Sequence, residues 1–304
     1  MDEVEPGWIR HFAQVLGVNR TSIYRKSTQR NARDEQDSQQ LLAIHSSHPA
    51  YGYRRLRLVL GWSAGKTRRL MKVATVTPLG VRRKHSWKHT KAKWPVSTRM
   101  RTNLLKTATN PNGLVATYPH HVWAEDFTYL WFQNKWYYLA TVIDLHSRQV
   151  VGWALGARHT TELIETALLD ATVKHPAPAI LHNDRGSEYC SWHYELLCSS
   201  LEIELSFSDK GSPWQNGFQE SFYREFKVEL QAKQLDRFND LGELLEAVAQ
   251  QLHYYNTSRI HTALQTNPAA YAARFEQKNL MLQHEHINRG TTGVRDRVLQ
   301  EGGA

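Results

Sequence analysis

The chain has 304 residues, of which 41% are apolar and 11% aromatic, a composition typical of a folded protein and not of a disordered one. It contains no run of eighteen apolar residues and no start resembling a signal peptide, so neither a membrane-spanning nor a secreted protein is expected. The net charge of +9 divides into +16 over residues 1–120, with 22 basic and 6 acidic residues, and −7 over the remainder, which predicts that the N-terminal part contacts a polyanion, nucleic acid above all.

The first predicted elements are two short helices within residues 12–26, separated by a turn at Gly17. Asn19 or Thr21 would cap the second helix. Such a pair is the outline of a helix-turn-helix that binds DNA, although ordinary helical hairpins share that outline. We therefore assign residues 1–35 as a possible helix-turn-helix, and we expect residues 27–40 to form a polar bridge.

Residues 36–81 are predicted to form a small, basic helical region that binds DNA. A first helix ends near Gly61, and Ser63 caps a second helix. On this second helix Arg68 and Lys72 lie four residues apart and so make one basic face, which suits phosphate contacts. The candidate DNA contacts in this region are Arg54, Arg55, Arg68, Arg69 and Lys72.

Residues 82–119 are basic, rich in turn signals and only weakly periodic, which predicts a linker that follows DNA. Over residues 38–120 there are 16 basic residues and no acidic one. A disordered basic tail would share that pattern, but apolar residues in the first half of the stretch, Leu56 and Leu70 among them, argue against it. Nucleic acid is therefore the expected partner.

From residue 120 the pattern changes to that of an α/β domain, assigned to residues 120–232. Three alternating segments rich in aromatic residues and joined by short turns predict antiparallel strands. Helices and strands then alternate, which implies a mixed five-stranded sheet with helices on its faces. A C-terminal helical extension (233–280) and a polar tail (281–304) follow. In chain order the predicted elements are strands 122–132, 135–144 and 149–155, helix 160–174, strand 179–184, helix 191–200, strand 203–208 and helix 218–231.

Three carboxylates can meet in this arrangement. Asp126 lies inside the first strand, Asp184 at the end of the fourth, and Glu220 near the start of the last helix. If the fourth strand lies beside the first, the two aspartates come together near the centre of the sheet. Glu220 would also suit a solvated helix face, but a loop rich in Gly, Pro and Asn just before the helix favours a functional role. The apolar stripe that leaves Glu220 on another face consists of Phe218, Phe222, Phe226 and Leu230.

The other acidic residues nearby are weaker candidates. Glu125 adjoins Asp126 on a strand and therefore points to the opposite face. A simple hairpin register sets Ala140 opposite Asp126 and leaves Asp144 about 13 Å away on the same face, where it is expected to cap the next turn. Glu188 and Asp209 are expected to be solvated loop residues.

Three converging carboxylates repel one another and stay ionised only with a cation between them. Hard oxygen donors favour Mg²⁺ or Mn²⁺, and neither the two cysteines nor the 16 histidines have the spacing of a zinc site. A pair of such ions about 4 Å apart activates an attacking oxygen and stabilises the leaving oxygen at a phosphodiester. Next to a basic N-terminal part, the expected chemistry is phosphoryl transfer on DNA.

Four ordered motifs give the chain a family resemblance. They surround Asp126 (VWAEDFTYL), follow it at 142–153 (VIDLHSRQVVGW), surround Asp184 (HNDRGSEY) and surround Glu220 (SDKGSPWQNGFQESFYREFKVEL). The segments HPAYGYRRLR and YYNTSRIHTALQTNPAAY flank them, and 35 residues separate Asp184 from Glu220. Over residues 40–275 the chain resembles the DDE transposases of bacterial insertion sequences, of the second-reading-frame type with a retroviral-integrase-like core.

The resemblance implies an RNase H-like fold in which Asp126, Asp184 and Glu220 hold two Mg²⁺ ions, or Mn²⁺ in their place. It implies a cytoplasmic, nucleoid-associated bacterial enzyme that hydrolyses a DNA strand at the end of an insertion sequence and joins the freed 3′-OH to another phosphodiester. Its implied partners are double-stranded DNA, further copies of itself and the product of an upstream reading frame. The expected DNA contacts near the cleaved phosphate are Lys227, Asn216 and Arg185.

Two alternative functions remain open: a catalytically inactive DNA-binding regulator, and an RNase H-like nuclease that cuts without joining. The intact triad favours the enzyme over the regulator, and a simple nuclease would not need the GSPWQNG and YYNTSR segments. His182 shares strand parity with Asp184, and it either supports that carboxylate or is a satisfied core histidine. The chain departs from the family pattern, without loss of a ligand, at Asn183, Glu188 and Gln215, where Ser, Gln and Asp are common.

Overall fold

The computed structural model describes residues 28–80, 116–184, 186–208 and 217–275, together with the isolated positions 11, 14, 15, 17, 103, 104 and 277. They belong to two compact units, residues 1–78 and residues 79–304, and each is described by itself. The predicted helix pair within 12–26 lies outside the described residues, apart from isolated positions, as do most of the linker and the polar tail. Within the described ranges, no helix is long and apolar enough to cross a bilayer.

The described residues of the smaller unit form three helices, α3 (Thr28–Ser47), α4 (Tyr53–Leu60) and α5 (Ala64–Val73). Gly61 ends α4 with a φ of 66°, and the Ser63 side chain caps α5 by accepting a hydrogen bond from the Lys66 N–H, as predicted. The prediction of a polar bridge over residues 27–40 is wrong for residues 28–40, which lie in α3; residue 27 lies outside the described residues. The polar segment is helical because its acidic residues pair with α5 and Leu41 is fully buried.

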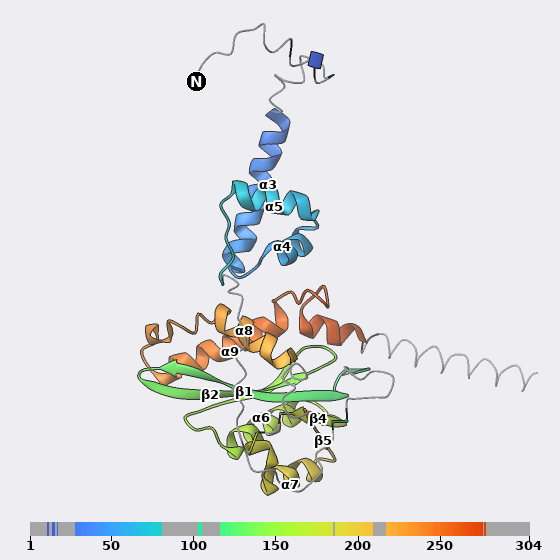
Figure 1. The fold of residues 1–304 in the computed structure, drawn as a ribbon, viewed down its shortest axis with the longest axis vertical. Helices are drawn as coiled ribbons and strands as arrows, with labels where there is room; N and C mark the ends of the chain where they lie inside the picture. Colours follow the sequence, from blue (N-terminus) through green and yellow to red (C-terminus); the bar gives the residue numbers. More distant parts are fainter. Residues whose placement is uncertain are drawn as a thin grey trace, which may run out of the picture. The chain divides into compact units, whose positions relative to one another are not determined.

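The larger unit is built on one five-stranded sheet with the strand order β3-β2-β1-β4-β5 (Figure 1). The first three strands are antiparallel neighbours, whereas β4 and β5 run parallel to β1. The predicted mixed sheet is thus confirmed, the fourth strand does lie beside the first, and this order is that of an RNase H-like fold. The strands are β1 (Val122–Phe132), β2 (Lys135–Asp144), β3 (Val150–Gly156), β4 (Ile180–Asn183) and β5 (Glu204–Phe207).

Helices cover both faces of this sheet (Figure 1). On one face α6 (Thr161–Lys174) and α7 (Trp192–Ser200) enclose one apolar core, and on the other α8 (Gly217–Glu229) and α9 (Leu241–Thr257) enclose a second. The approach of α6 is close, because a Cβ at Gly152 would lie 2.4 Å from a backbone oxygen of that helix. Two short 3-10 helices, η1 (Glu188–Cys190) and η3 (Leu235–Arg237), lie between these elements.

The β1–β2 hairpin differs from its predicted register by one residue. Gln133 and Asn134 form a two-residue turn with φ angles of 47° and 60°, so Thr141 and not Ala140 lies opposite Asp126. Asp144 consequently pairs with Trp123, on the other face of the sheet from Asp126. A one-residue shift reverses every side chain of the partner strand, which is why the predicted face of Asp144 was wrong.

The end of α9 and the residues that follow it bind neighbouring elements of the larger unit together. Asn256 accepts a hydrogen bond from the Val150 N–H (2.9 Å) and donates one to the Val150 carbonyl (2.8 Å), at the edge strand β3. Arg259, which is 2% exposed, forms 2.6 Å ion pairs with Glu225 and Glu229 of α8. The YYNTSR motif therefore fastens α8 to the rest of the core.

Candidate active site

Asp126 lies in the middle of β1, just beyond the point where that strand stops pairing with β4. The parallel ladder to β4 covers β1 only from Val122 to Ala124. Burial raises the pKa of Asp126 to about 8, with further raising from the carboxylates of Asp184 and Glu220, although the Phe127 N–H donates to Oδ1 at 2.8 Å. This carboxylate is therefore within electrostatic reach of both other members of the predicted triad.

Asp184 directly follows β4, and the chain then makes a tight turn. The Gly186 N–H donates to its Oδ1 at 2.8 Å. A Cβ at Gly186 would lie 3.0 Å from that oxygen and 2.8 Å from a Glu188 carboxylate oxygen, so a larger residue here would displace both carboxylates. Burial raises the pKa of Asp184, as does Glu188, while the Gly186 N–H and His159 lower it.

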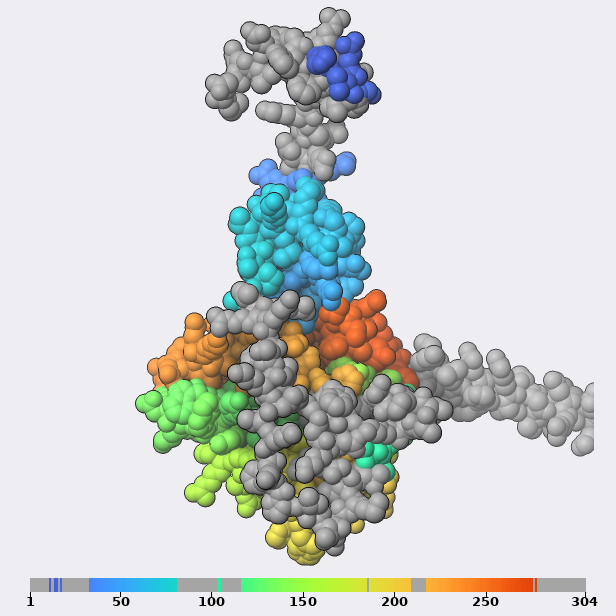
Figure 2. Space-filling view, viewed as in Figure 1, coloured from blue at the N-terminus to red at the C-terminus, as the bar shows by residue number. Residues whose placement is uncertain are grey.

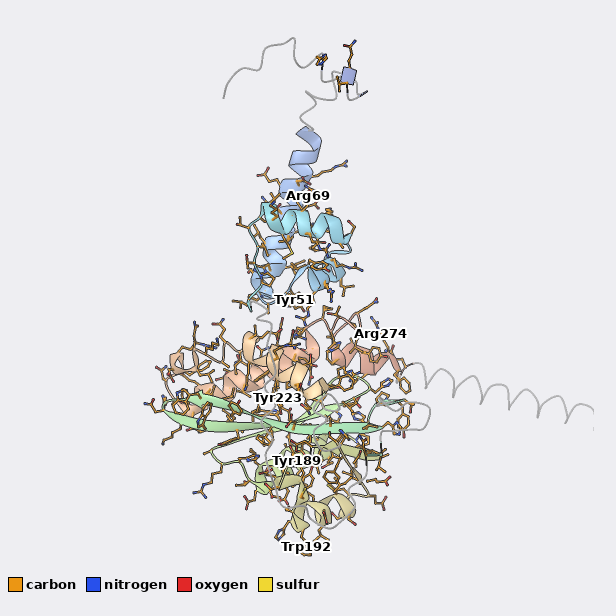
Figure 3. The ribbon with its side chains drawn as sticks, viewed as in Figure 1. Tyr51, Arg69, Tyr189, Trp192, Tyr223 and Arg274 are labelled. Carbon is orange, nitrogen blue, oxygen red and sulfur yellow. The ribbon has the colours of Figure 1, made fainter. Side chains whose placement is uncertain are left out.

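Glu220 lies in the first turn of α8, and two neighbouring polar side chains hold this helix on the sheet. Gln219 donates from Nε2 to the Ala124 carbonyl at 2.7 Å. Tyr223 donates its hydroxyl to the carbonyl of Asp126 itself at 2.5 Å. Figure 3 shows Tyr223 between α8 and the sheet. These contacts position Glu220 relative to Asp126.

Sequence reasoning missed both of these buried polar residues. Gln219 is completely buried and Tyr223 is 6% exposed, whereas Phe218, predicted to lie in the apolar stripe, is 38% exposed. Phe218 instead stacks under the guanidinium of Arg148, 3.6 Å from its ring centroid. The available signal was the spacing of Gln219 and Tyr223, which lie four residues apart and on either side of Glu220.

The donor set suits a hard divalent cation in its chemistry. All three members are carboxylates, and burial raises the pKa of each, for Glu220 against the opposing charge of Arg224. A cation beside them would favour their ionised forms. Among the residues that the structure describes, no three His, Cys, Asp or Glu side chains already converge closely enough to hold a metal ion. Asp184 and Glu220 thus raise the pKa of Asp126, although the three carboxylates do not lie close enough together to hold one ion.

The competing carboxylates have other roles. Glu125 is fully buried on the opposite face, as predicted; burial raises its pKa well above its usual range, and Tyr194 donates a hydrogen bond to it. Asp144 caps the turn after β2, as predicted, by accepting hydrogen bonds from the Ser147 N–H and hydroxyl. Glu188 was expected to be solvated, but its side chain is only 14% exposed and pairs with His159 at 3.2 Å, because η1 folds it inward.

His182 is a satisfied core histidine. It is 1% exposed, with Nδ1 3.0 Å from the Ser206 hydroxyl and Nε2 3.0 Å from the Ser208 hydroxyl. Burial lowers its pKa to about 4, so the ring is neutral at physiological pH. Among the described residues, His182 has no hydrogen bond to Asp184, so the alternative that it supports this carboxylate directly is not favoured.

The predicted DNA contacts have differing surroundings. Lys227 lies on α8 two turns after Glu220, with Nζ 4.3 Å from the Tyr129 ring centroid, and burial lowers its pKa. Asn216 and Arg185 lie outside the described residues. In the smaller unit Arg69 donates two hydrogen bonds to the Asp34 carboxylate, at 2.5 and 2.8 Å. The exposed side chains of the set are Arg54, Arg68 and Lys72, while Arg55 is half-buried over the Tyr51 ring.

Comparison with known proteins gives consistent matches. Two family models, both described as integrase core domain, match residues 116–213 and 201–268. The 31 kDa protein of insertion element IS600 from Shigella sonnei is 31% identical over 278 residues, which are 87% of this chain and 98% of that protein. Transposase InsF for insertion sequence IS3A from Escherichia coli K12 is 34% identical over 230 residues, 73% of this chain and 78% of InsF. A solved HTLV-2 integrase catalytic core domain, in complex with magnesium, is 21% identical, covers 52% of this chain and 99% of its own, and has a TM-score of 0.45.

Proposed function

The chain belongs to the transposases of bacterial insertion sequences, and from this premise we propose that Asp126, Asp184 and Glu220 are its catalytic, metal-binding residues. As a transposase with an integrase core it is a polynucleotidyl transferase that acts on DNA. The observation that carries the residue assignment is the pKa of Asp126, raised to about 8 by burial and by the other two carboxylates. Carboxylates that are buried and repel one another are typical of a site that binds a cation, because the cation offsets their negative charge.

The proposed cofactor is Mg²⁺, with Mn²⁺ as a substitute and two ions in the site. When bound, these ions would activate the attacking oxygen and stabilise the leaving oxygen of a DNA phosphodiester. All three ligands are oxygen donors, and thiolates are absent from the set, which supports a hard cation over zinc.

The chain's own residues have complementary tasks in this proposal. The turn at Gly186 presents Asp184 at the end of β4, and the hydrogen bonds of Gln219 and Tyr223 keep α8 and its Glu220 over β1. Lys227 offers a partly desolvated ammonium group on the same helix, which suits a phosphate next to the reacting bond. Strand hydrolysis and strand joining would then use one site, with water and the freed 3′-OH as successive nucleophiles.

DNA binding and assembly complete the proposal. The exposed basic residues Arg54, Arg68 and Lys72 of the smaller unit would contact phosphates away from the reaction. Bringing two DNA ends together requires at least two copies of the chain, so we propose a dimer or larger homo-oligomer on DNA. The product of an upstream reading frame is proposed as a further partner.

The test is incubation of the full chain with Mg²⁺ and DNA that carries both element ends. We expect joined products from the natural chain. Asp126→Asn and Glu220→Gln should each bind the DNA with nearly unchanged affinity and yield neither nicks nor joined products. EDTA should have the same effect on the natural chain.

The matched control is Glu162→Gln, which removes an equal charge from the exposed first turn of α6. This variant should join DNA ends as the natural chain does. Cleavage by Glu220→Gln would refute the ligand assignment, nicks without joined products would favour the nuclease, and binding without any cleavage would favour the regulator.

A further inference from the structure

The β1–β2 hairpin exposes three large aromatic side chains on one face. Tyr129 is 56% exposed, Trp131 43% and Trp136 47%. The strand register sets Trp131 opposite Trp136, and Tyr129 lies two residues before Trp131, so all three project from the same side of the sheet. Figure 2 shows the hairpin, in green, at the left edge of the larger unit. A contiguous exposed aromatic surface of this kind indicates a binding site.

These rings form an ordered surface, which we name the aromatic platform (Tyr129, Trp131 and Trp136). The Trp136 ring packs edge-on against Tyr129, with centroids 5.2 Å apart, and against Trp131, at 4.7 Å. The turn beneath it is pinned, because the Gln133 N–H donates to Asp236 at 2.9 Å and the Gln133 side chain to the Asn239 carbonyl at 2.8 Å. The platform therefore needs little ordering when it binds a partner.

The platform is linked to the active site through Lys227. Tyr129 follows Asp126 by three residues on the same strand, about 10 Å along it, and projects from the opposite face of the sheet. Lys227, on the helix that carries Glu220, places Nζ 4.3 Å from the Tyr129 ring centroid. Within the described part of the chain, Lys227 has no ion pair with a carboxylate, so its charge is available to an anion at this edge.

Aromatic rings beside an unpaired cation match the chemistry of an unpaired nucleotide strand. Base-aromatic stacking uses the π-face that every base has, and a nearby lysine contacts the phosphate. A second copy of this chain would bind the platform by apolar contact alone, and Lys227 would then have no anionic partner. Charge complementarity and the contact between Lys227 and Tyr129 therefore favour DNA over a protein partner.

We propose that the aromatic platform stacks against unpaired bases of the DNA strand that flanks the reacting phosphodiester, while Lys227 contacts the phosphate between them. The inference rests on the proposed function for its DNA substrate. It adds a binding surface for the open strand end beside Lys227, on the helix that carries Glu220. Because stacking is tolerant of sequence, the platform recognises the unpaired state of the end and not its base order.

The experiment compares two fluorescent DNA probes from the element end, one fully paired and one with a short unpaired flank. Binding is measured in EDTA with the full chain. The double variant Trp131→Leu, Trp136→Leu should lose on the order of tenfold affinity or more for the flanked probe and little for the paired probe. Its salt dependence should stay unchanged because no charge is removed.

The matched control is Trp192→Leu, since Trp192 is 64% exposed on α7, well away from α8 in Figure 3. It should bind both probes as the natural chain does. Trp131→Phe with Trp136→Phe should restore most of the affinity, because an aromatic face is kept. In the natural chain, 5-iododeoxyuridine in the flank should photo-crosslink to residues 129–136, a readout that does not depend on how well a variant folds.

Equal affinity of the leucine variant for the flanked probe, or crosslinks confined to other segments, would overturn the proposal. A change in the oligomeric state of the DNA-free chain in the leucine variant, without loss of flank binding, would also overturn it and assign the platform to a protein interface. Because binding is measured without divalent cations, these outcomes are independent of cleavage. Failure of cleavage by the natural chain would refute only the proposed function.

Discussion

Replacing Arg259 with methionine tests how the C-terminal segment holds the catalytic helix. The Arg259 side chain is 3% exposed, with Nε 2.6 Å from Glu229 and Nη2 2.6 Å from Glu225, both on α8. Burial by itself lowers the pKa of this guanidinium, but the charges of Glu229 and Glu225 outweigh that effect and the net shift is upward. The ion pairs thus more than offset the burial of the cation.

The magnitude follows from what the substitution leaves behind. Glu229 would stay buried, with its side chain 6% exposed and the Gln251 amide, at 3.0 Å, as its remaining hydrogen-bond donor. Glu225 is 31% exposed and can be hydrated. Removing one partner of a buried pair costs about 3–5 kcal/mol, so we expect Arg259→Met to lower the free energy of unfolding by about 3 kcal/mol.

The assay is urea unfolding of the full chain, followed by circular dichroism, with hydrogen exchange reporting on the amides of α8. The control is the triple variant Arg259→Met, Glu225→Gln, Glu229→Gln, which removes the uncompensated charges as well. It should recover most of the loss, to within about 1 kcal/mol of the natural chain. A loss of less than about 1 kcal/mol in Arg259→Met, or a triple variant as unstable as the single one, would refute the reasoning.

Three further predictions concern other parts of the chain. Gly152→Ala should lower the free energy of unfolding by about 3 kcal/mol, measured in urea, because its Cβ would lie 2.4 Å from the backbone of α6. The pKa of His182 is about 4 in the folded chain, below its ordinary value of about 6.5, so its contribution to stability is fully present above about pH 6.5. Up to about 3 kcal/mol of the free energy of unfolding is lost as the pH falls towards 4. His182→Gln should therefore flatten the dependence of the unfolding free energy on pH between pH 7 and pH 5. Arg68→Ala with Lys72→Ala should reduce the salt slope of DNA binding by about 2. Arg69→Ala should instead destabilise the smaller unit, since Asp34 already pairs with it.

The Gly152→Ala and His182→Gln predictions each have a control of the same chemistry. Gly65→Ala places its Cβ in open space on α5 and should cause no loss of stability. His253→Gln replaces an exposed histidine and should leave the pH profile unchanged. A Gly152→Ala chain as stable as the natural one, a His182→Gln chain with an unaltered profile, or an unchanged salt slope would contradict the respective prediction.

Periodicity and spacing along the chain were enough to predict the catalytic elements. Alternating apolar residues predicted β1 and β2 at their observed bounds, since a half-buried strand has a side-chain period of two. Short connections predicted their antiparallel pairing, and an α/β alternation predicted helices on both faces. Asp126, Asp184 and Glu220 emerged as candidates because each sits where a sheet edge or a helix start can present a carboxylate.

Other features depended on contacts that no local pattern contains. The two-residue turn at Gln133 decided the hairpin register, and one residue of shift moved Asp144 to the opposite face. The polar side chains of Gln219 and Tyr223 are buried because backbone carbonyls of β1 meet them, although their residue types suggest a solvated face.

The N-terminal charge pattern was only partly informative for the same reason. A run without acidic residues predicted free cations, but Asp34 and Asp37 of α3 pair with Arg69 and Lys66 across the smaller unit. By itself, then, the sequence determined which elements form and which carboxylates are candidates, because those follow from short-range periodicity and motif spacing. Only the tertiary structure decided which polar groups are paired and which remain available to DNA, because ion pairs and hydrogen bonds depend on residues brought together by folding.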